Sequence, residues 1–152
     1  MLSNIINKND VRSYFSEKGA KNLYNSKNLS GLYQMFGEIT PNDGNVYMKK
    51  LYSYALKNTT NSNYLVDSFK NASLNNIGQA SGTTTAHKYG WTSNYVSDIA
   101  LIFDENPYVL TITTTMGYED WSSFIKNIAS RIQQIHDLYW NNLNETCKNL
   151  LR

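Results

Sequence analysis

The sequence HKYGW, at positions 87–91, combines several groups that can take part in chemistry. It interrupts a run of β-branched residues that begins at Thr83, so we expect it on a strand. The ammonium group of Lys88 favours a neighbouring carboxylate, and Gly90 allows a ligand backbone to approach without a Cβ in the way. The backbone N–H of Trp91 could donate to a developing oxyanion. The alternative for Lys88 is an exposed strand residue that makes a cross-strand contact.

The two histidines and the single cysteine are weaker candidates. His87 alternates with Lys88 along the strand and should point to the opposite face, where packing beneath the final helix explains it at least as well as catalysis. We expect His136, on the polar flank of a helix, to be solvated. With no clustered acids around either histidine, the sequence predicts no metal site and no cofactor. Cys147 excludes an internal disulfide, and no neighbour activates it.

The first half of the chain has the features of helices. Residues 1–7 and 10–18 are typical of the end of one helix and of a second one, and residues 58–63 of a polar loop. At the start of a third helix, Thr40 can cap, Pro41 suits the first position and Asp43 can reach back to the cap. This helix should run to about residue 57, and a shorter one over about 62–70 should bring two apolar side chains together. The apolar residues expected to share faces are Met48, Leu51, Tyr52 and Ala55 in the first of these, and Leu65 and Phe69 in the second.

Three β-branched runs, over residues 83–91, 95–103 and 108–116, predict three adjacent antiparallel strands. After them, apolar residues recur at helical spacing and predict a closing helix that lies on the sheet. The sequence therefore predicts an α+β fold in which a helical segment is followed by a three-stranded antiparallel sheet covered by a long C-terminal helix. The apolar residues of the closing helix are Trp121, Phe124, Ile125, Ile128, Ile132, Ile135, Leu138 and Tyr139.

Length and composition limit the organisation and the partners. We expect one domain over 1–152, with a helical part at 1–75, strands at 80–118 and the closing helix at 119–147. Fourteen basic against twelve acidic residues leave a formal charge of +2, and the scattered basic residues predict no nucleic-acid partner. The longest apolar runs are far shorter than the roughly 20 residues of a membrane span, and the first residues lack the apolar core of a secretory signal.

Longer stretches around the lysine motif resemble a known family. "TTTAHKYGW" with the following "SNYVSDIALIFDENPYVLTITT" closely resembles the C-terminal part of the class A β-lactamase-like serine hydrolases, which belong to the penicillin-recognising superfamily. Three further stretches are similar to helices of that family: "ITPNDGNVYMKKLYSYAL", "YLVDSFKNASLNNI" and "WSSFIKNIASRIQQIHDLY". The resemblance covers residues 1–139, and it implies the back half of that fold.

The resemblance also implies roles for the lysine strand. Lys88 is similar to the lysine of the family's Lys-Thr-Gly motif, which helps to hold a substrate carboxylate and tunes proton transfers. Tyr89 stands where the family has threonine, which puts recognition through a hydroxyl in doubt. Gly90 matches the motif, and the backbone N–H of Trp91 corresponds to one of two oxyanion donors. The predicted catalytic residues are therefore Lys88 and Trp91, and the predicted substrate-binding residues are these two with Tyr89 and Gly90.

Other elements of the family are not in their places. The sequence Ser123-Phe-Ile-Lys126 matches the nucleophile motif Ser-x-x-Lys, but it follows the lysine strand, and Ser97-Asp98 is similar to Ser-Asp-Asn but sits within a strand. Glu38 has the spacing of the deacylating glutamate, yet it overlaps the helix cap. We therefore expect that the front half of the fold is missing and that the chain alone is inactive.

These observations leave three functions open. The first is the C-terminal portion of a serine hydrolase, in whose complete parent an acyl-serine forms with a β-lactam or a D-Ala-D-Ala-like peptide. Such a parent would be secreted or sit in the cell envelope, whereas the location of this chain itself stays unknown. The second is a non-catalytic binding or cell-wall-associated module with the same shell. The third is a small α+β ligand-binding domain outside the family. The expected protein partners are a second copy of the chain or the missing N-terminal half.

Overall fold

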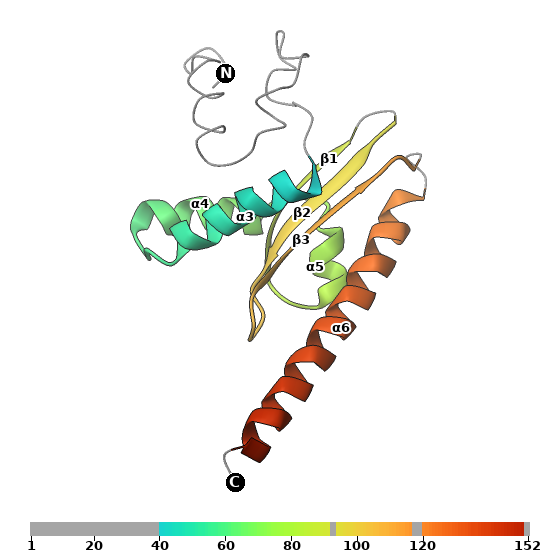
Figure 1. Ribbon diagram of the computed structural model, residues 1–152. Coiled ribbons are helices and arrows are strands. Elements are labelled where there is room, and N and C mark those ends of the chain that lie inside the picture. The colour runs from blue at the N-terminus through green and yellow to red at the C-terminus, as the bar shows by residue number, and fades with distance from the viewer. Residues whose placement is uncertain (1–39, 92–93, 117–119, 151–152) are drawn as a thin grey trace.

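The computed structural model describes residues 40–91, 94–116 and 120–150 (Figure 1). The helices predicted within residues 1–18 and the candidate Glu38 lie outside the described residues. In chain order the described elements are the helices α3 (Pro41–Ala55), α4 (Thr60–Lys70) and α5 (Asn76–Ser81), the strands β1 (Thr85–Trp91), β2 (Val96–Ile102) and β3 (Tyr108–Thr114), and the helix α6 (Trp121–Leu150). Segregated helices and an antiparallel sheet confirm the predicted α+β fold.

The three strands form one antiparallel sheet in the order β1-β2-β3. Lys88 lies opposite Ile99 on β2, and Ile99 lies opposite Thr111 on β3. Because paired residues share a face of the sheet, these three side chains are on the same face. The predicted strands are confirmed, with ends that differ by one or two residues.

Helices cover both faces of the sheet. Figure 1 shows α3 and α4 on one side of the strands, and α5 and α6 on the other. Along β2, Ile99 and Leu101 join the cluster of α3 and α4, whereas Ala100 and Ile102 join the cluster of α5 and α6. The central strand has nearly all of its side chains buried, as expected of a strand between two helical layers.

Helix α3 begins as the sequence predicts. The backbone N–H of Asp43 donates to Thr40 Oγ1 at 3.2 Å, and the backbone N–H of Thr40 donates to Asp43 Oδ2 at 3.1 Å, which completes a capping box. The next residue, Gly44, is the point where the helix meets the sheet: a Cβ there would lie 2.7 Å from Thr111 Oγ1. The missing side chain therefore lets α3 pack close to β3.

The region between α3 and β1 differs from the prediction in three ways. A second capping box at Thr59 starts α4 inside the segment predicted as a loop. In α4 the buried apolar residue is Val66, whereas the predicted Leu65 is 40% exposed. The short helix α5 was not predicted; Asn75 caps it, and Gly82 ends it in the left-handed conformation.

Helix α6 is only partly covered. Trp121 and Ile125 pack into the core, as predicted, and so does Ala129, which was not predicted, whereas Ile135 and Leu138 are exposed. The reason is length: strands of seven residues extend about 23 Å, whereas a helix of 30 residues extends about 45 Å. Figure 1 shows α6 continuing beyond the ends of the strands. None of the helices in the described part of the chain is both long and apolar enough to cross a bilayer.

Candidate functional site

Strand β1 carries the lysine predicted to be functional. Lys88 shares its sheet face with Ile99, and so with the layer of α3 and α4. Its side chain is exposed, and its ammonium donates to the carbonyl oxygen of Tyr89 and lies 5.2 Å from the centroid of the Tyr89 ring. The charge thus stands at the surface, where a ligand can reach it.

Gly90 lies on the same face of β1 as Lys88. A Cβ at this position would meet Ser97 Oγ at 3.6 Å, which is an ordinary van der Waals contact. The described residues therefore do not require a glycine here, in contrast to Gly44. The missing side chain leaves room beside the lysine that a ligand backbone could use.

Tyr89 and Trp91 complete the predicted set. Tyr89 pairs with Asp98 and Trp91 with Val96, so alternation directs both side chains away from the face of Lys88. The indole of Trp91 is 55% exposed. The structure therefore brings all four predicted residues together on one strand but divides their side chains between two faces. The role of the Trp91 backbone N–H as an oxyanion donor stays a prediction.

His87 is buried on the opposite face of the sheet from Lys88, which is the face that the sequence predicted. Its Nε2 lies 3.0 Å from the carbonyl oxygen of Ala72, and because a carbonyl only accepts, Nε2 carries a proton. Its Nδ1 lies 3.8 Å from Asp98 Oδ1, and Asp98 Oδ2 accepts from the backbone N–H of Ile77 at 3.4 Å. Both side chains are fully buried, so they tie β1 and β2 to the segment around α5.

The two serine motifs do not approach the lysine. Ser123 is an exposed residue of α6, which covers the face of the sheet opposite Lys88. Ser97 lies within β2 opposite Gly90, and its neighbour Asp98 is buried against α5. That Ser123 is not the family's nucleophile, and that Ser97-Asp98 is not its Ser-Asp-Asn element, stay predictions.

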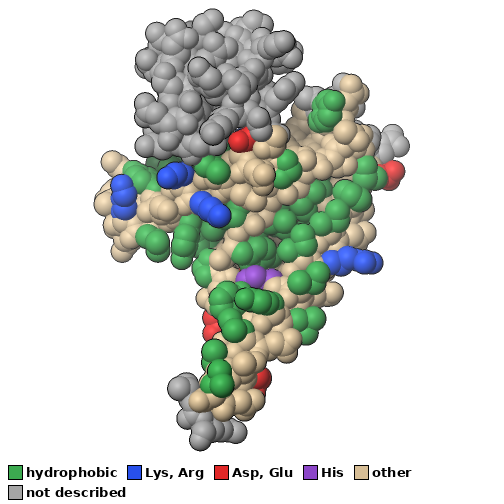
Figure 2. Space-filling view, in the orientation of Figure 1, with side chains coloured by type: hydrophobic (Ala, Val, Ile, Leu, Met, Phe, Trp, Pro, Cys, Tyr) green, Lys and Arg blue, Asp and Glu red, His purple; other side chains and the backbone are tan. Residues whose placement is uncertain are grey.

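Two open hollows lie near α3, away from Lys88. One of about 340 Å³ is lined by Tyr52, Leu101 and Pro107 among others, and one of about 530 Å³ is lined by Tyr52, Val66 and Phe103 among others. Lys88 lines neither of them. Figure 2 shows hydrophobic side chains gathered over α3, the strands and the outer part of α6. Much apolar surface therefore remains uncovered by the described residues.

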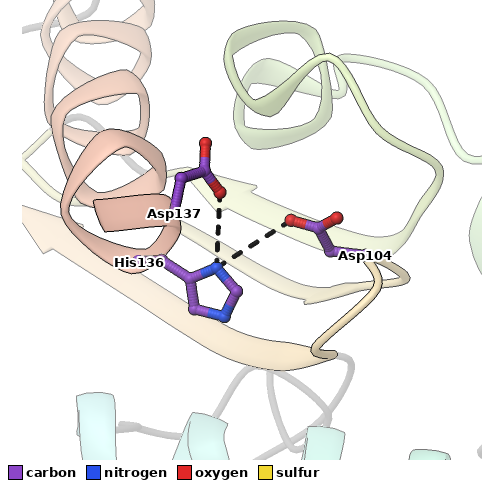
Figure 3. Close-up of side chains that lie close together, drawn as sticks. All are labelled: Asp104, His136 and Asp137. Carbon is purple, nitrogen blue, oxygen red and sulfur yellow. Dashed lines mark ion pairs between the residues drawn. The ribbon is translucent and has the colours of Figure 1, made fainter. Parts of the chain in front are cut away.

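A second group of polar side chains lies where the β2–β3 turn meets α6. His136 is only 14% exposed, and Figure 3 shows its ring facing the carboxylates of Asp104 and Asp137. The predictions that His136 is solvated and has no clustered acids near it are wrong. Asp104 is 32 positions away in the sequence, and only the fold brings it to the helix. In the sequence, the only sign of this cluster is that His136 and Asp137 are adjacent.

Both the sequence and the fold of this chain are similar to those of known proteins. A family model described as the Beta-lactamase enzyme family matches residues 1–136. The fold is similar to the solved structure of PBP-A, with a TM-score of 0.67 and 23% identity over 84% of this chain and 51% of that chain. It is also similar to a PBP-A variant solved as an acyl-enzyme complex with penicillin G, with a TM-score of 0.68 and 22% identity over the same shares. The chain thus spans about half the length of these structures, and no curated protein matches it.

Proposed function

Because this chain belongs to the Beta-lactamase enzyme family, we propose that β1 forms one wall of an active site at which a serine is acylated. The observation that carries this proposal is the pair on one face of β1: an exposed ammonium at Lys88, and a glycine at position 90 that the described packing does not require. If the glycine were needed for packing, neighbouring atoms would lie too close to position 90 to leave room for a Cβ.

The proposed substrate class is a β-lactam or a D-Ala-D-Ala-like peptide. Both carry a carboxylate, which the ammonium of Lys88 would attract, and an amide carbonyl, which becomes an oxyanion on attack. The substrate backbone would lie along β1 beside Gly90, and the N–H of Trp91 would donate to the oxyanion. Tyr89 would contribute through its backbone, because its side chain points to the other face of the sheet.

The attacking serine would come from polypeptide beyond these 152 residues. The motif Ser-x-x-Lys occurs once in the sequence, and its serine lies on α6, across the sheet from Lys88. We therefore propose that residues 1–152 act as one partial domain and are inactive by themselves. The β3 edge, which pairs only with β2 in the described part of the chain, and the exposed apolar side chains of α6 favour pairing with a front half or with a second copy.

A second candidate function is a non-catalytic binding or cell-wall-associated module. Tyr89 supports it, because a family hydroxyl that contacts the substrate carboxylate is replaced by a side chain on the opposite face. The two hollows near α3, neither of which Lys88 lines, support it further. Such a module would keep the affinity for a carboxylate ligand without forming a covalent adduct.

Covalent labelling with a fluorescent penicillin separates these functions. The chain would be co-refolded with the front half of PBP-A, and assembly would be confirmed by size-exclusion chromatography before labelling. We expect label on the assembled pair, none on the chain alone, and at least tenfold slower labelling with Lys88→Ala. Lys148→Ala removes an exposed lysine at the end of α6 and serves as the matched control. No label on a well-assembled pair would reject the catalytic function and favour the binding module.

A further inference from the structure

The cluster at the β2–β3 turn joins three side chains from two distant elements. His136 Nδ1 lies 3.9 Å from Asp104 Oδ2 and 3.6 Å from Asp137 Oδ1 (Figure 3). One nitrogen and two carboxylate oxygens thus lie within 4.8 Å of one another. Imidazole nitrogen and carboxylate oxygen are donors that divalent transition metals use in proteins.

These separations are too long for hydrogen bonds and close to those between the ligands of one metal ion. A separation of 3.6 Å or more between nitrogen and oxygen is too long for a hydrogen bond, and Nδ1 of His136 is buried without such a bond in the described part of the chain. Ligand atoms bound at about 2.1 Å to a tetrahedral ion lie about 3.4 Å apart. The two carboxylate oxygens lie within 4.8 Å of each other, so a shift of about 1 Å in one carboxylate would let one ion contact all three atoms.

Gln133 holds the two carboxylates in place. This side chain is 9% exposed, and its Nε2 donates to Asp104 Oδ2 at 2.7 Å and to Asp137 Oδ1 at 2.8 Å. Each oxygen has a further lone pair that remains able to bind an ion. The backbone N–H of Glu105 donates to the other oxygen of Asp104, Oδ1, at 2.7 Å, so both oxygens of this carboxylate are oriented by hydrogen bonds.

The histidine ring is also fixed from the side. The ring of Tyr108 lies 4.3 Å from that of His136, centroid to centroid, and the Tyr108 hydroxyl donates to Gln133 Oε1 at 2.6 Å. The same tyrosine therefore orients both the imidazole and the amide that holds the carboxylates. Outer partners of this kind set the geometry of metal ligands in known sites.

We propose that Asp104, His136 and Asp137 bind a divalent transition-metal ion of the Zn²⁺ type, with water in the remaining position. Mg²⁺ and Ca²⁺ fit less well, because they prefer six or more oxygen ligands and no imidazole. The ion would cross-link the β2–β3 turn to α6 at the level where the helix leaves the sheet. It would therefore stabilise the fold and is independent of the function proposed for β1.

Zn²⁺ titration by isothermal calorimetry tests the proposal in a Cys147→Ser background, which removes an exposed thiol that could bind zinc. We expect one site, a melting temperature that rises with Zn²⁺, and a visible absorption band with Co²⁺ in place of Zn²⁺. His136→Gln and Asp137→Asn should each weaken binding by about tenfold or more. Asp67→Asn is the matched control, since it removes an exposed aspartate that pairs only with Lys70 in the described residues.

Two outcomes would overturn the proposal. Equal Zn²⁺ affinity in the parent and in both ligand variants would place the metal elsewhere. No saturable Zn²⁺ binding up to about a hundredfold excess would show that the cluster is not a metal site. Asp137 is half exposed, so its asparagine variant should fold even if the His136 variant does not.

Discussion

Gly90→Ala tests whether this glycine serves a ligand or the fold. The new Cβ would lie 3.6 Å from Ser97 Oγ, with nothing closer in the described structure, and the residue has no left-handed backbone conformation that would strain an alanine. Replacing glycine by alanine at an unstrained site reduces the entropy of the unfolded chain and stabilises by about 0.4–1 kcal/mol. We therefore expect the free energy of unfolding to stay equal or to rise by about 0.5 kcal/mol.

Gly44→Ala is the matched control, because it makes the same substitution where the packing is tight. Its Cβ would lie 2.7 Å from Thr111 Oγ1 and 2.9 Å from Thr111 Cγ2. Overpacking of this kind costs about 1–3 kcal/mol, and the higher helix propensity of alanine offsets about 1 kcal/mol of that cost. The expected net effect is a destabilisation of about 1 kcal/mol, opposite in sign to that of Gly90→Ala.

Urea denaturation followed by circular dichroism measures both variants against the parent chain, with the slope of the transition checked for equality. In the assembled pair described above, Gly90→Ala should also slow penicillin labelling, because the methyl group occupies the room beside β1. A loss of 1 kcal/mol or more in Gly90→Ala would refute the reasoning, since it would show that the fold itself needs the glycine.

Two further predictions concern stability. Thr40→Ala removes the cap of α3 and should lower the free energy of unfolding by about 1 kcal/mol in urea denaturation, whereas an unchanged midpoint would contradict the role of the capping box. Burial, with a smaller contribution from Asp43, raises the pKa of Tyr47 well above its ordinary value of 10. The folded chain therefore keeps this proton to higher pH than the unfolded chain, so the stability that the neutral phenol provides is complete below about pH 10 and is lost as the pH rises further. Tyr47→Phe should flatten the fall of the melting temperature above pH 10, and an unchanged pH profile would contradict the assignment.

Local signals in the sequence were sufficient for the elements that depend on neighbouring residues. The start of α3 is set by Thr40 and Asp43, which are three positions apart and bond to each other's backbone. The strands follow from β-branched runs that turn residues interrupt, and the faces of Lys88 and His87 follow from simple alternation. In each case the information needed lies within a few residues of the feature.

Features that depend on tertiary contacts were not predictable in the same way. Leu65 and Val66 are equally apolar, and which of them is buried depends on how α4 rotates against β1 and α3. Helix α5 has only six residues, too few for a periodic pattern, and it is held by contacts such as the hydrogen bond from Ser122 to Asn76. The apolar spacing of α6 continues past the sheet, so periodicity alone overestimated its burial.

The two candidate sites illustrate the same division. Lys88 and Gly90 are two positions apart on one strand, so their common face follows from the period of a β-strand, and a family motif could identify them. Asp104 and His136 meet only because the β2–β3 turn lies beside the fifth turn of α6, although the two residues are 32 positions apart in the sequence. Predicting this contact would require knowing, to within one turn of helix, how α6 packs on the sheet, and the sequence does not contain that information in any local pattern. The metal proposal therefore tests the packing of α6 on the sheet, whereas the lysine proposal tests the chemistry of a motif.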